Sequence, residues 1–312
     1  MYHLSKGNTL NFSSCHGYEN YLNIAHQNNL MADNVTVVEQ QGRFEALLVK
    51  VQFSDCRKRV LYVTDSNPPM SSILSTICDK EGFNAQVKRL FALWICNGLL
   101  DLRLRPGQNL QDAIKCWPKW LEKFGNEMNA ESFSLVFKRD ALVTVEKEKF
   151  IQDEAVIKLL YAEAAKFVTE GKYPTTLNEA LLLAGLELHI LYGDYNAEKH
   201  TKEFVMESME ELISSFHRRA SKQDDLAQKL IIEYKKHCGL TAKKAIMLYL
   251  SFVRKWPCYG SIFYPACKTA PPGGIFANRH EKILIGVNMK GIHVVDIDKN
   301  VIIPLTLEIR TI

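Results

Sequence analysis

The hydrophobic pattern of this chain changes twice along its length, and each change limits the fold that it can adopt. Between residues 45 and 140, short apolar runs alternate with polar positions and turn-forming residues, which is typical of β-strands. From residue 146 to 255 the apolar residues recur at helical spacing, and from 256 to 312 strand-like runs return. A strand-rich block, a helical block and a second strand-rich block predict an α+β multidomain protein.

The first block has the element order of a ubiquitin-like β-grasp. Apolar alternation predicts two strands, over 46–53 and 58–64, joined by a turn. Ile73 and Ile77 are one helical turn apart and indicate an amphipathic helix after this hairpin. Further strands are expected at 90–96, 101–104 and 133–137, with a small helix at 117–124. A hairpin, a helix and then more strands predict a β-grasp over residues 45–140.

The second block is predicted to be a bundle of five helices. Asp153 can cap the first helix, which Gly171 and Pro174 end. The second helix, over 177–192, is apolar nearly all round and is therefore expected to be buried. Later helices are predicted at 206–217, 226–237 and 242–254. Short connections between them predict a compact bundle over 146–255.

The third block predicts a short sheet. Strands are expected at 256–264, 282–287, 292–296 and 301–309. A loop rich in Pro and Gly, at 270–274, follows the first of these strands, and Gly291 provides the φ > 0 conformation that a tight hairpin requires. Three or four strands with nothing to cover them are only marginally stable.

Composition and charge exclude several classes of protein. The net charge of +4 over 312 residues is too weak for a nucleic-acid-binding surface, so no nucleic-acid partner is expected. No apolar run reaches the roughly 18 residues that a membrane-spanning helix needs. Residues 1–44 lack a signal-peptide pattern and are expected to be a disordered tail. The eight cysteines contain no CxxC pair, which predicts reduced, mostly buried thiols in a cytoplasmic protein.

No pattern in the sequence predicts catalysis, a cofactor or a metal site. Phosphate-binding loops, the GxGxxG pattern after a strand, HExxH and GxSxG are absent. His189, His200, His217 and His237 lie in the helical block without the paired short spacings of zinc ligands. We interpret His189 as a core histidine that is held by a hydrogen bond. The alternatives for the histidines and cysteines are a metal site, or a Cys/His nucleophile pair whose members meet only in the folded structure.

Several segments resemble the FERM family. Residues 91–96 are similar to a later strand of its first lobe, and 117–121 to the small helix of that lobe. Residues 188–195 resemble the core helix and exit turn of the second lobe, and 286–293 resemble strands of the third. The resemblance covers about residues 45–305, and it is specific because three independent blocks agree in order.

This resemblance implies three lobes. They are a ubiquitin-like F1 at 45–140, a helical F2 similar to acyl-CoA-binding protein at 146–255, and a truncated PH/PTB-like F3 at 256–312. A full F3 adds further strands and a closing helix, beside which such lobes bind cytoplasmic tails, so tail binding by this F3 is an open question. The alternative expectation is a truncated isoform with an incomplete F3 that lacks stable tail binding and is prone to self-association.

The resemblance also implies a function. A FERM protein is expected to be a non-enzymatic scaffold or adaptor without a cofactor, cytoplasmic and peripheral at the plasma membrane or at cell junctions. Two divergent branches of the family fit these residues. Members of one bind a Rap-type small GTPase through F1 and F2, and members of the other hold an inactive rhomboid-like protein at the cell surface. The implied partner is a small GTPase of the Rap type, the cytoplasmic tail of a transmembrane protein, or both.

Two groups of basic residues are candidates for a GTPase-facing surface of F1. Arg57, Lys58 and Arg59 begin the second predicted strand, and Lys88 and Arg89 precede the third. The resemblance implies strand-against-strand docking of a small GTPase, in which basic side chains face an acidic switch region and speed the encounter. Arg59 is the best-placed single residue on this interpretation. The alternative is a solvated hairpin with scattered basic side chains.

A second basic region is predicted near the junction of F2 and F3. Lys235, Lys236, Lys243 and Lys244 lie at the end of one predicted helix and the start of the next. Contact of such residues with an anionic lipid surface contributes about 1 kcal/mol per basic residue. The alternative is an ordinary exposed helix face.

Overall fold

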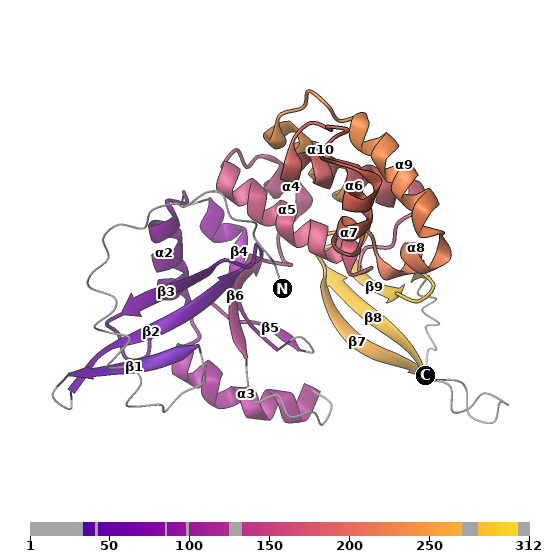
Figure 1. Cartoon of the computed structure of the whole chain (residues 1–312). Coiled ribbons are helices and arrows are strands. Elements are labelled where there is room, and N and C mark those ends of the chain that lie inside the picture. Colours follow the sequence, from indigo (N-terminus) through magenta and orange to yellow (C-terminus); the bar gives the residue numbers. More distant parts are fainter. Residues whose placement is uncertain are drawn as a thin grey trace.

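Three lobes make up the part of the chain that the structure describes (Figure 1). The structure is a computed structural model, and it describes residues 34–40, 43–84, 86–97, 100–124, 133–269 and 280–304. The first lobe combines a sheet with helices, the second is helical, and the third is a small sheet, drawn in yellow. The α+β fold class and the order of the three blocks are therefore confirmed.

The first lobe is a β-grasp with one additional strand. Its elements are β1 (Val35–Gln40), β2 (Arg43–Phe53), β3 (Lys58–Val63), α2 (Met70–Glu81), η1 (Val87–Arg89), β4 (Phe91–Cys96), β5 (Asp101–Arg103), α3 (Leu110–Phe124) and β6 (Ser134–Arg139). The first strand of the grasp, β2, pairs in parallel with the last, β6, and in antiparallel fashion with β3. β4 lies between β6 and β5. This pairing confirms the predicted β-grasp.

The additional strand β1 pairs with the N-terminal part of β2, residues 43–49. The same edge of β2 pairs with β6 further along, at residues 51–53, and the opposite edge pairs with β3. The Asn34 side chain donates a hydrogen bond to the Phe133 carbonyl, where the two shorter strands meet. The predicted disordered tail over 1–44 is therefore wrong for β1. This strand pairs with the open edge of the long strand β2 and buries Val35 and Val38. Residues 1–33 lie outside the described part of the chain.

The helices of the first lobe follow the predicted order. Ile73 and Ile77 of α2 are buried, as predicted. Gly82 adopts the left-handed conformation (φ 71°), and the Phe83 N–H donates to the Cys78 carbonyl at 2.8 Å, which ends the helix. Helix α3 is longer than predicted and begins at Leu110. Its buried residues recur every three or four positions, so the amphipathic pattern extends upstream of the two tryptophans.

The second lobe is a helical bundle. Its elements are α4 (Val145–Lys149), α5 (Glu154–Thr169), α6 (Leu177–Tyr192), α7 (Lys202–Leu212), α8 (Ser215–Ala220), α9 (Gln223–Lys235) and α10 (Ala242–Val253). Asp153 caps α5 as predicted, and Thr176 and Glu179 form a capping box at the start of α6. The apolar α6 packs against both α9 and α10. A Cβ at Gly185 would lie 3.1 Å from the Tyr234 backbone nitrogen, so glycine permits the close approach of α6 and α9.

One helix prediction in this lobe is wrong. The single helix expected over 206–217 is divided into α7 and α8. Ile213 is extended (φ −127°, ψ 133°), and Ser214, a residue type that favours helix N-caps, begins the second helix. The Arg218 side chain donates to the Ile213 carbonyl at 3.1 Å, which satisfies a backbone acceptor at the break.

The third lobe is an antiparallel sheet in the order β10–β9–β8–β7. Its strands are β7 (Ile262–Thr269), β8 (His280–Asn288), β9 (Gly291–Asp296) and β10 (Val301–Ile303). The predicted hairpin around Gly291 (φ 130°) is confirmed by the pairing of β8 with β9. The last predicted strand is confirmed over β10, whereas 305–309 and the loop at 270–274 lie outside the described residues.

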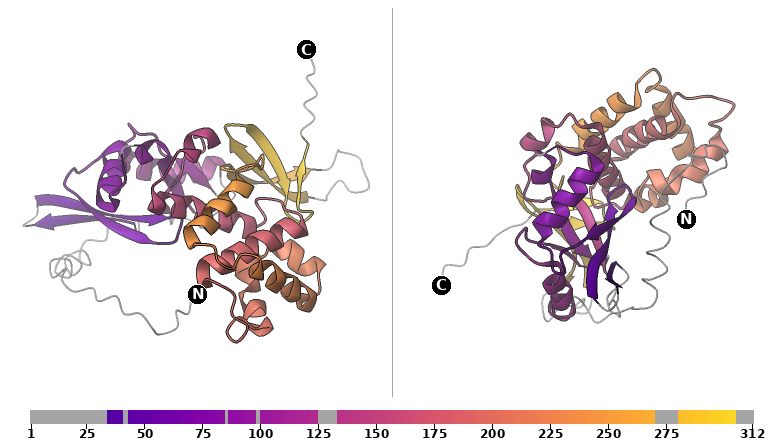
Figure 2. Two further views of the ribbon diagram at one scale, coloured as in Figure 1. Left: turned by 90° about the horizontal axis from the view of Figure 1, so that it is seen from above. Right: turned by 90° about the vertical axis from the view of Figure 1, so that its left-hand side faces the viewer.

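One apolar core joins the three lobes. Figure 2 shows these lobes from two further directions. It contains Phe137 of the first lobe, Tyr249 of the second and Val295 of the third. Phe263 of β7 makes ring contacts with Phe167 (5.6 Å) and Tyr173 (6.0 Å) of the helical lobe. Because these side chains fill one continuous core, each lobe supports the position of the other two.

Candidate functional site

The outer edge of β3 is the first candidate surface. Among the described strands β3 pairs only with β2, so its other edge presents free backbone N–H and C=O groups. Lys58, Arg59 and Val60, at the start of the strand, are exposed. An added strand from a partner can pair with such an edge.

Most of the positive charge predicted at this edge is paired within the lobe. Arg57 forms ion pairs with Asp55 (2.6 Å) and Glu81 (2.9 Å), and the Arg59 Nε lies 2.6 Å from Glu81 Oε1. Burial acts to raise the pKa of Glu81, but hydrogen bonds and charge from Arg59 and Arg57 outweigh it and hold the pKa below its usual value. Of the three basic residues at 57–59, Lys58 alone has no ion pair with a described residue.

The second predicted basic group lies near the first. Lys88 and Arg89 belong to η1, and the Lys88 ammonium lies 3.3 Å from Asp79 Oδ1. Asp79 and Glu81 are both in the last turn of α2, so the structure places the two basic groups around the same helix end. Arg89 is exposed there. The result is an edge with mixed charges rather than a uniformly basic face.

The four lysines of the helical lobe lie at the connection between α9 and α10. All four are exposed; Lys236 pairs with Glu233 (2.5 Å), and the Lys235 ammonium lies 4.7 Å from the centre of the Tyr195 ring. Lys243 and Lys244 occupy the first turn of α10, and the rest of this helix separates them from the third lobe. They are therefore at the far end of α10 from the junction where the sequence predicted them.

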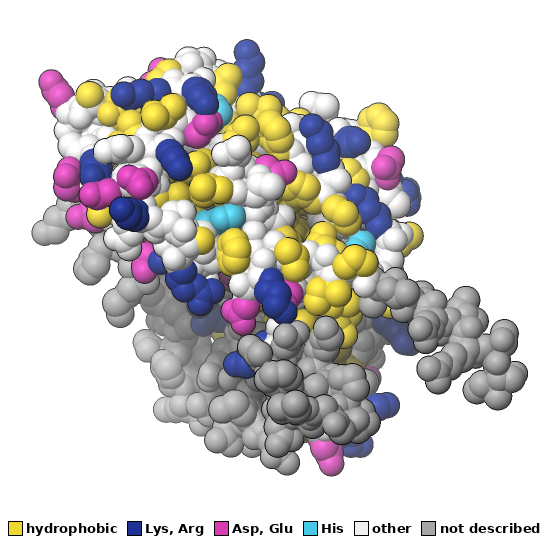
Figure 3. All heavy atoms as spheres, turned by 90° about the vertical axis from the view of Figure 1, so that its right-hand side faces the viewer, with side chains coloured by type: hydrophobic (Ala, Val, Ile, Leu, Met, Phe, Trp, Pro, Cys, Tyr) yellow, Lys and Arg dark blue, Asp and Glu magenta, His cyan; other side chains and the backbone are white. Residues whose placement is uncertain are grey.

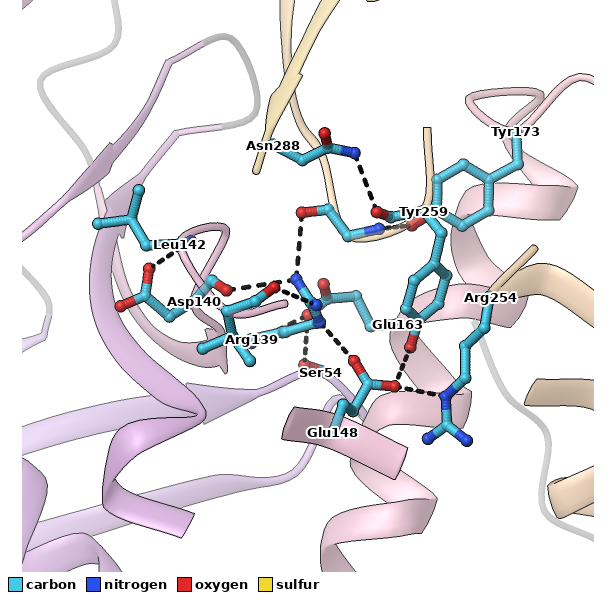
Figure 4. Close-up of polar contacts among 12 residues, drawn as sticks. Ser54, Arg139, Asp140, Leu142, Glu148, Glu163, Tyr173, Arg254, Tyr259 and Asn288 are labelled. Atoms are coloured by element: carbon cyan, nitrogen blue, oxygen red, sulfur yellow. Dashed lines mark hydrogen bonds and ion pairs between the residues drawn. The ribbon is translucent and has the colours of Figure 1, made fainter. Parts of the chain in front are cut away.

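A buried polar network connects the three lobes, and sequence reasoning missed it (Figure 4). Glu148 of α4, 1% exposed, accepts hydrogen bonds from Arg139 Nε (2.7 Å), Arg254 Nε (2.7 Å) and the Tyr259 hydroxyl (2.5 Å). Arg139 ends the last strand of the first lobe, Arg254 follows α10, and Tyr259 precedes β7. Glu148 stands in the charged run 146–149, where nothing in the sequence distinguishes it from its exposed neighbours.

The charges of this network are stabilised by one another. Burial alone would lower the pKa of Arg139, but the neighbouring Tyr259 and Glu148 raise it above its usual value. Burial, together with the charge of Glu148, raises the pKa of the Tyr259 hydroxyl well above its usual value. Arg139 is therefore cationic and Tyr259 is a neutral hydrogen-bond donor at pH 7. The hydrogen bonds of this network join segments of all three lobes.

The turn into the third lobe is fitted closely to Arg139. Gly260 has a left-handed backbone (φ 72°), and a Cβ at this position would overlap the Arg139 guanidinium. The Gly260 N–H donates to the Tyr173 hydroxyl (2.8 Å), and its carbonyl accepts from Arg139 Nη1 (3.3 Å). The Asn288 side chain donates to the Tyr259 carbonyl (3.0 Å) and so ties β8 to this turn. Only glycine combines this conformation with this approach.

A cleft of about 600 Å³ lies between the first lobe, α5 and β7. Glu163 of α5 lines it and accepts hydrogen bonds from the Ser54 hydroxyl (3.2 Å) and the Arg139 backbone N–H (3.3 Å). Burial raises the pKa of Glu163 above its usual value in spite of the nearby Lys138. Lys138 itself pairs with Asp101 at 2.5 Å. The cleft is therefore lined by the hydrogen-bonded Glu163 and by the Lys138–Asp101 ion pair, together with Lys58.

The histidines of the helical lobe are core residues rather than members of a cluster. His189 Nε2 lies 2.8 Å from the Leu240 carbonyl, which confirms its predicted role, and His217 Nε2 lies 3.0 Å from the Thr175 carbonyl. Within the described ranges, no three His, Cys, Asp or Glu side chains come together as a metal site would require. In the same part of the chain, no helix is both long and apolar enough to cross a membrane.

Comparison with known protein families and sequences identifies the helical lobe. The FERM central domain family matches residues 146–264. FERM domain-containing protein 8 of Xenopus laevis is 27% identical over 244 residues, which cover 70% of this chain and 54% of the relative. The chain thus spans about half the length of the curated relative that it matches.

Solved structures show the same fold. The C-terminal MyTH4-FERM domain of human myosin 7b, solved in complex with the harmonin-a PDZ3 domain, matches with a TM-score of 0.64 at 18% identity, over 83% of this chain and 51% of that one. Drosophila Merlin, solved as a complex of its FERM and C-terminal domains, matches with a TM-score of 0.56 at 15% identity, over 79% and 74%. These similarities establish the fold.

Proposed function

Because this chain is a FERM-domain protein, we propose that it works as a non-enzymatic scaffold at the cytoplasmic face of membranes, at the plasma membrane or at cell junctions. Its partners on this proposal are a Rap-type small GTPase, the cytoplasmic tail of a transmembrane protein, or both. The shared core of the three lobes supports the proposal, since a scaffold must hold its docking surfaces in fixed relation. The solved complexes of the two similar FERM proteins, one with a PDZ domain and one with a C-terminal domain, also support a binding role.

The open edge of β3 is the observation that carries the GTPase proposal. It offers unpaired backbone groups for strand addition, with Lys58 free of an ion pair among the described residues. Because Glu81 holds Arg57 and Arg59, these arginines position the edge, and Lys58 supplies the uncompensated charge toward an acidic partner.

Binding to a Rap-type GTPase, loaded with a GTP analogue or with GDP, tests this proposal. We expect nucleotide-dependent binding that Lys58→Glu weakens at least about tenfold, since reversal of a charge opposite an acidic surface both removes attraction and adds repulsion. Lys115→Glu, an exposed lysine of α3, is the matched control and should bind like the unchanged protein. Equal loss in both variants, or no binding by folded protein, would contradict the proposal.

A second proposal concerns the third lobe, where apolar side chains remain exposed. Val287 and Ile292 are paired neighbours on β8 and β9 and are 37% and 59% exposed, and Val301 is 44% exposed. Such a face favours either docking of a transmembrane protein's tail or self-association of the chain. Light scattering separates these outcomes. A monodisperse monomer supports the scaffold with a free docking face, and concentration-dependent growth in mass that Ile292→Lys abolishes supports self-association.

A further inference from the structure

The first lobe contains a small pocket between α2 and the strands β4 and β5. The pocket has a volume of about 150 Å³, and it is lined by the start of α2, by η1 and by the facing parts of the two strands. In the sheet, β3 and β5 lie on opposite sides, with β2, β6 and β4 between them. The pocket is therefore a different surface from the open edge of β3.

The interior of this pocket is mainly apolar. Its lining includes the buried side chains of Met70, Phe91, Leu93 and Leu104, together with the partly buried Leu74. An apolar cavity of roughly 150 Å³ can hold a molecule of the size of benzene. The ring of Phe91 and the thioether of Met70 both make favourable contacts with an aromatic ring. The pocket thus has the size and the chemistry to hold one aromatic side chain.

Backbone hydrogen bonds fix the walls of the pocket. The Leu104 N–H donates to the Leu93 carbonyl (2.9 Å), which holds the end of β5 against β4. The Ser71 N–H donates to the Pro106 carbonyl (2.9 Å), which ties the start of α2 to the turn that follows β5. Because the walls are already in place, a ligand does not have to order them, and less free energy is lost on binding.

Three basic side chains and one carboxylate line the same pocket. The basic side chains are Lys88, Arg89 and Arg103, and the carboxylate is Asp140, so these lining residues carry a net charge of +2. Asp140 is already engaged, since Arg103 Nη2 lies 2.7 Å from its Oδ2 and the Leu142 N–H donates to its Oδ1 (3.0 Å). Arg89 is exposed and forms no ion pair with a described residue, so its charge is available to an anion.

The sign of this charge indicates what the pocket binds. Figure 3 shows the side of the molecule formed by the second and third lobes, on which apolar side chains lie among both basic and acidic ones. Mixed charges of that kind do not favour a partner of either sign. At the pocket of the first lobe the uncompensated charge is positive, so electrostatic complementarity favours an acidic partner.

We propose that this pocket binds an acidic segment of a partner protein, with one Phe side chain of the segment in the pocket and neighbouring carboxylates facing Arg89 and Lys88. The site goes beyond the docking proposed at β3 and gives the scaffold a second protein-binding surface. One buried anchor with a few exposed charges gives weak binding, roughly millimolar for an isolated peptide. A partner that another surface of the scaffold already holds binds more tightly, because attachment raises the local concentration of its acidic segment.

Titration with a short peptide, followed by NMR of the Met and Leu methyl groups, tests this proposal. The probe is the blocked peptide acetyl-Asp-Asp-Phe-Asp-Asp-amide, and its control has Ala in place of Phe. We expect the methyl resonances of Met70, Leu74 and Leu104 to shift as the Phe peptide is added. The Ala peptide should bind at least about tenfold more weakly, because it buries no aromatic side chain in the pocket.

Three variants of the protein distinguish the pocket from other charged surfaces. Arg89→Glu should weaken binding of the Phe peptide at least about tenfold, since the change places a carboxylate against the carboxylates of the peptide. Arg43→Glu makes the same substitution at an exposed position of β2 and should bind the peptide like the unchanged protein. Lys58→Glu, at the edge of β3, should also leave peptide binding unchanged.

Several results would overturn the proposal. They are the absence of any shift at millimolar peptide, shifts confined to other parts of the molecule, and equal loss of binding in Arg89→Glu and Arg43→Glu. Equal binding of the Phe and Ala peptides would also overturn it, because the site would then hold small anions rather than an anchored segment. Since Lys58→Glu is expected to weaken GTPase binding and to spare the peptide, failure of one proposal leaves the other standing.

Discussion

At the scale of single residues, the molecule depends most on buried charges that the sequence does not reveal. Glu148 receives hydrogen bonds from two buried arginines and a buried tyrosine that come from three parts of the chain. The pairing of Arg139 with Glu148 spans only nine residues, but Arg254 and Tyr259 are more than a hundred residues away. Such long-range pairs leave no local pattern, which is why the basic surfaces were predicted and this network was not.

Replacing Glu148 with Gln should strongly destabilise the protein. The change removes the charge that compensates Arg139 and Arg254, which are 5% and 8% exposed, and leaves them buried without an anion. Breaking a buried charge pair in this way costs about 3–5 kcal/mol of unfolding free energy. Denaturant unfolding measures the loss, with Glu146→Gln on the exposed side of the same helix as control. A variant as stable as the control would mean that the network does not hold the lobes.

Glu187→Gln should stabilise the protein in a pH-dependent way. Burial, with a contribution from Glu211, raises the pKa of Glu187 from 4.5 to about 8, and the carboxyl has no ion pair with a described residue. The folded state therefore holds the carboxyl proton of Glu187 more tightly than the unfolded chain does. The stability that protonated Glu187 contributes is fully present below about pH 4.5 and is lost as the pH rises to about 8. Glutamine stays neutral throughout.

The difference in unfolding free energy between Glu187→Gln and the unchanged protein should therefore grow with pH. Since Glu187 is only half-buried, we expect a gain of about 1–3 kcal/mol at pH 8.5 and almost none at pH 4.5. Thermal unfolding across this range measures it, with Glu207→Gln, exposed on α7, as the matched control. A gain that is the same at both pH values would show that titration of Glu187 is not its cause.

At the scale of elements, the local pattern predicted most of the fold, and pairing at a distance decided the rest. The hairpin of β2 and β3, helix α2 and the apolar α6 follow directly from alternation, helical spacing and caps. Strand β1 was missed because its stability comes from the free edge of β2 rather than from its own composition. The break between α7 and α8 was missed because Arg218 satisfies the Ile213 carbonyl only in the folded bundle.

Gly185→Ala should disturb the packing of α6 on α9. Alanine is the better helix former, but its Cβ would lie 3.0 Å from the Glu233 Cβ and 3.1 Å from the Tyr234 nitrogen, and so would force the helices apart. Overpacking of this kind costs about 1–3 kcal/mol. Gly107→Ala, which adds a Cβ in open space, is the control for the same substitution. Unfolding measurements that found Gly185→Ala as stable as Gly107→Ala would contradict the close approach.

At the scale of the whole molecule, the shared core predicts one cooperative unfolding transition. Tryptophan fluorescence reports on the first lobe, through Trp94, Trp117 and Trp120, and on the junction through Trp256, whereas far-ultraviolet circular dichroism is dominated by the helical lobe. Because one apolar core joins these lobes, the two signals should change at the same denaturant concentration. Two separated midpoints would show that the lobes unfold independently and do not form one rigid scaffold.

Hydrogen exchange distinguishes docking of a partner on the open edge of β3 from docking elsewhere on the molecule. The exchange of backbone amides is compared in the free chain and in its complex with a Rap-type GTPase loaded with a GTP analogue. Strand addition predicts slower exchange within Lys58–Val63, because a new strand would pair with backbone N–H groups that β2 leaves free. A stable complex in which β3 exchanges as fast as before, with protection on other elements, would contradict docking on this edge.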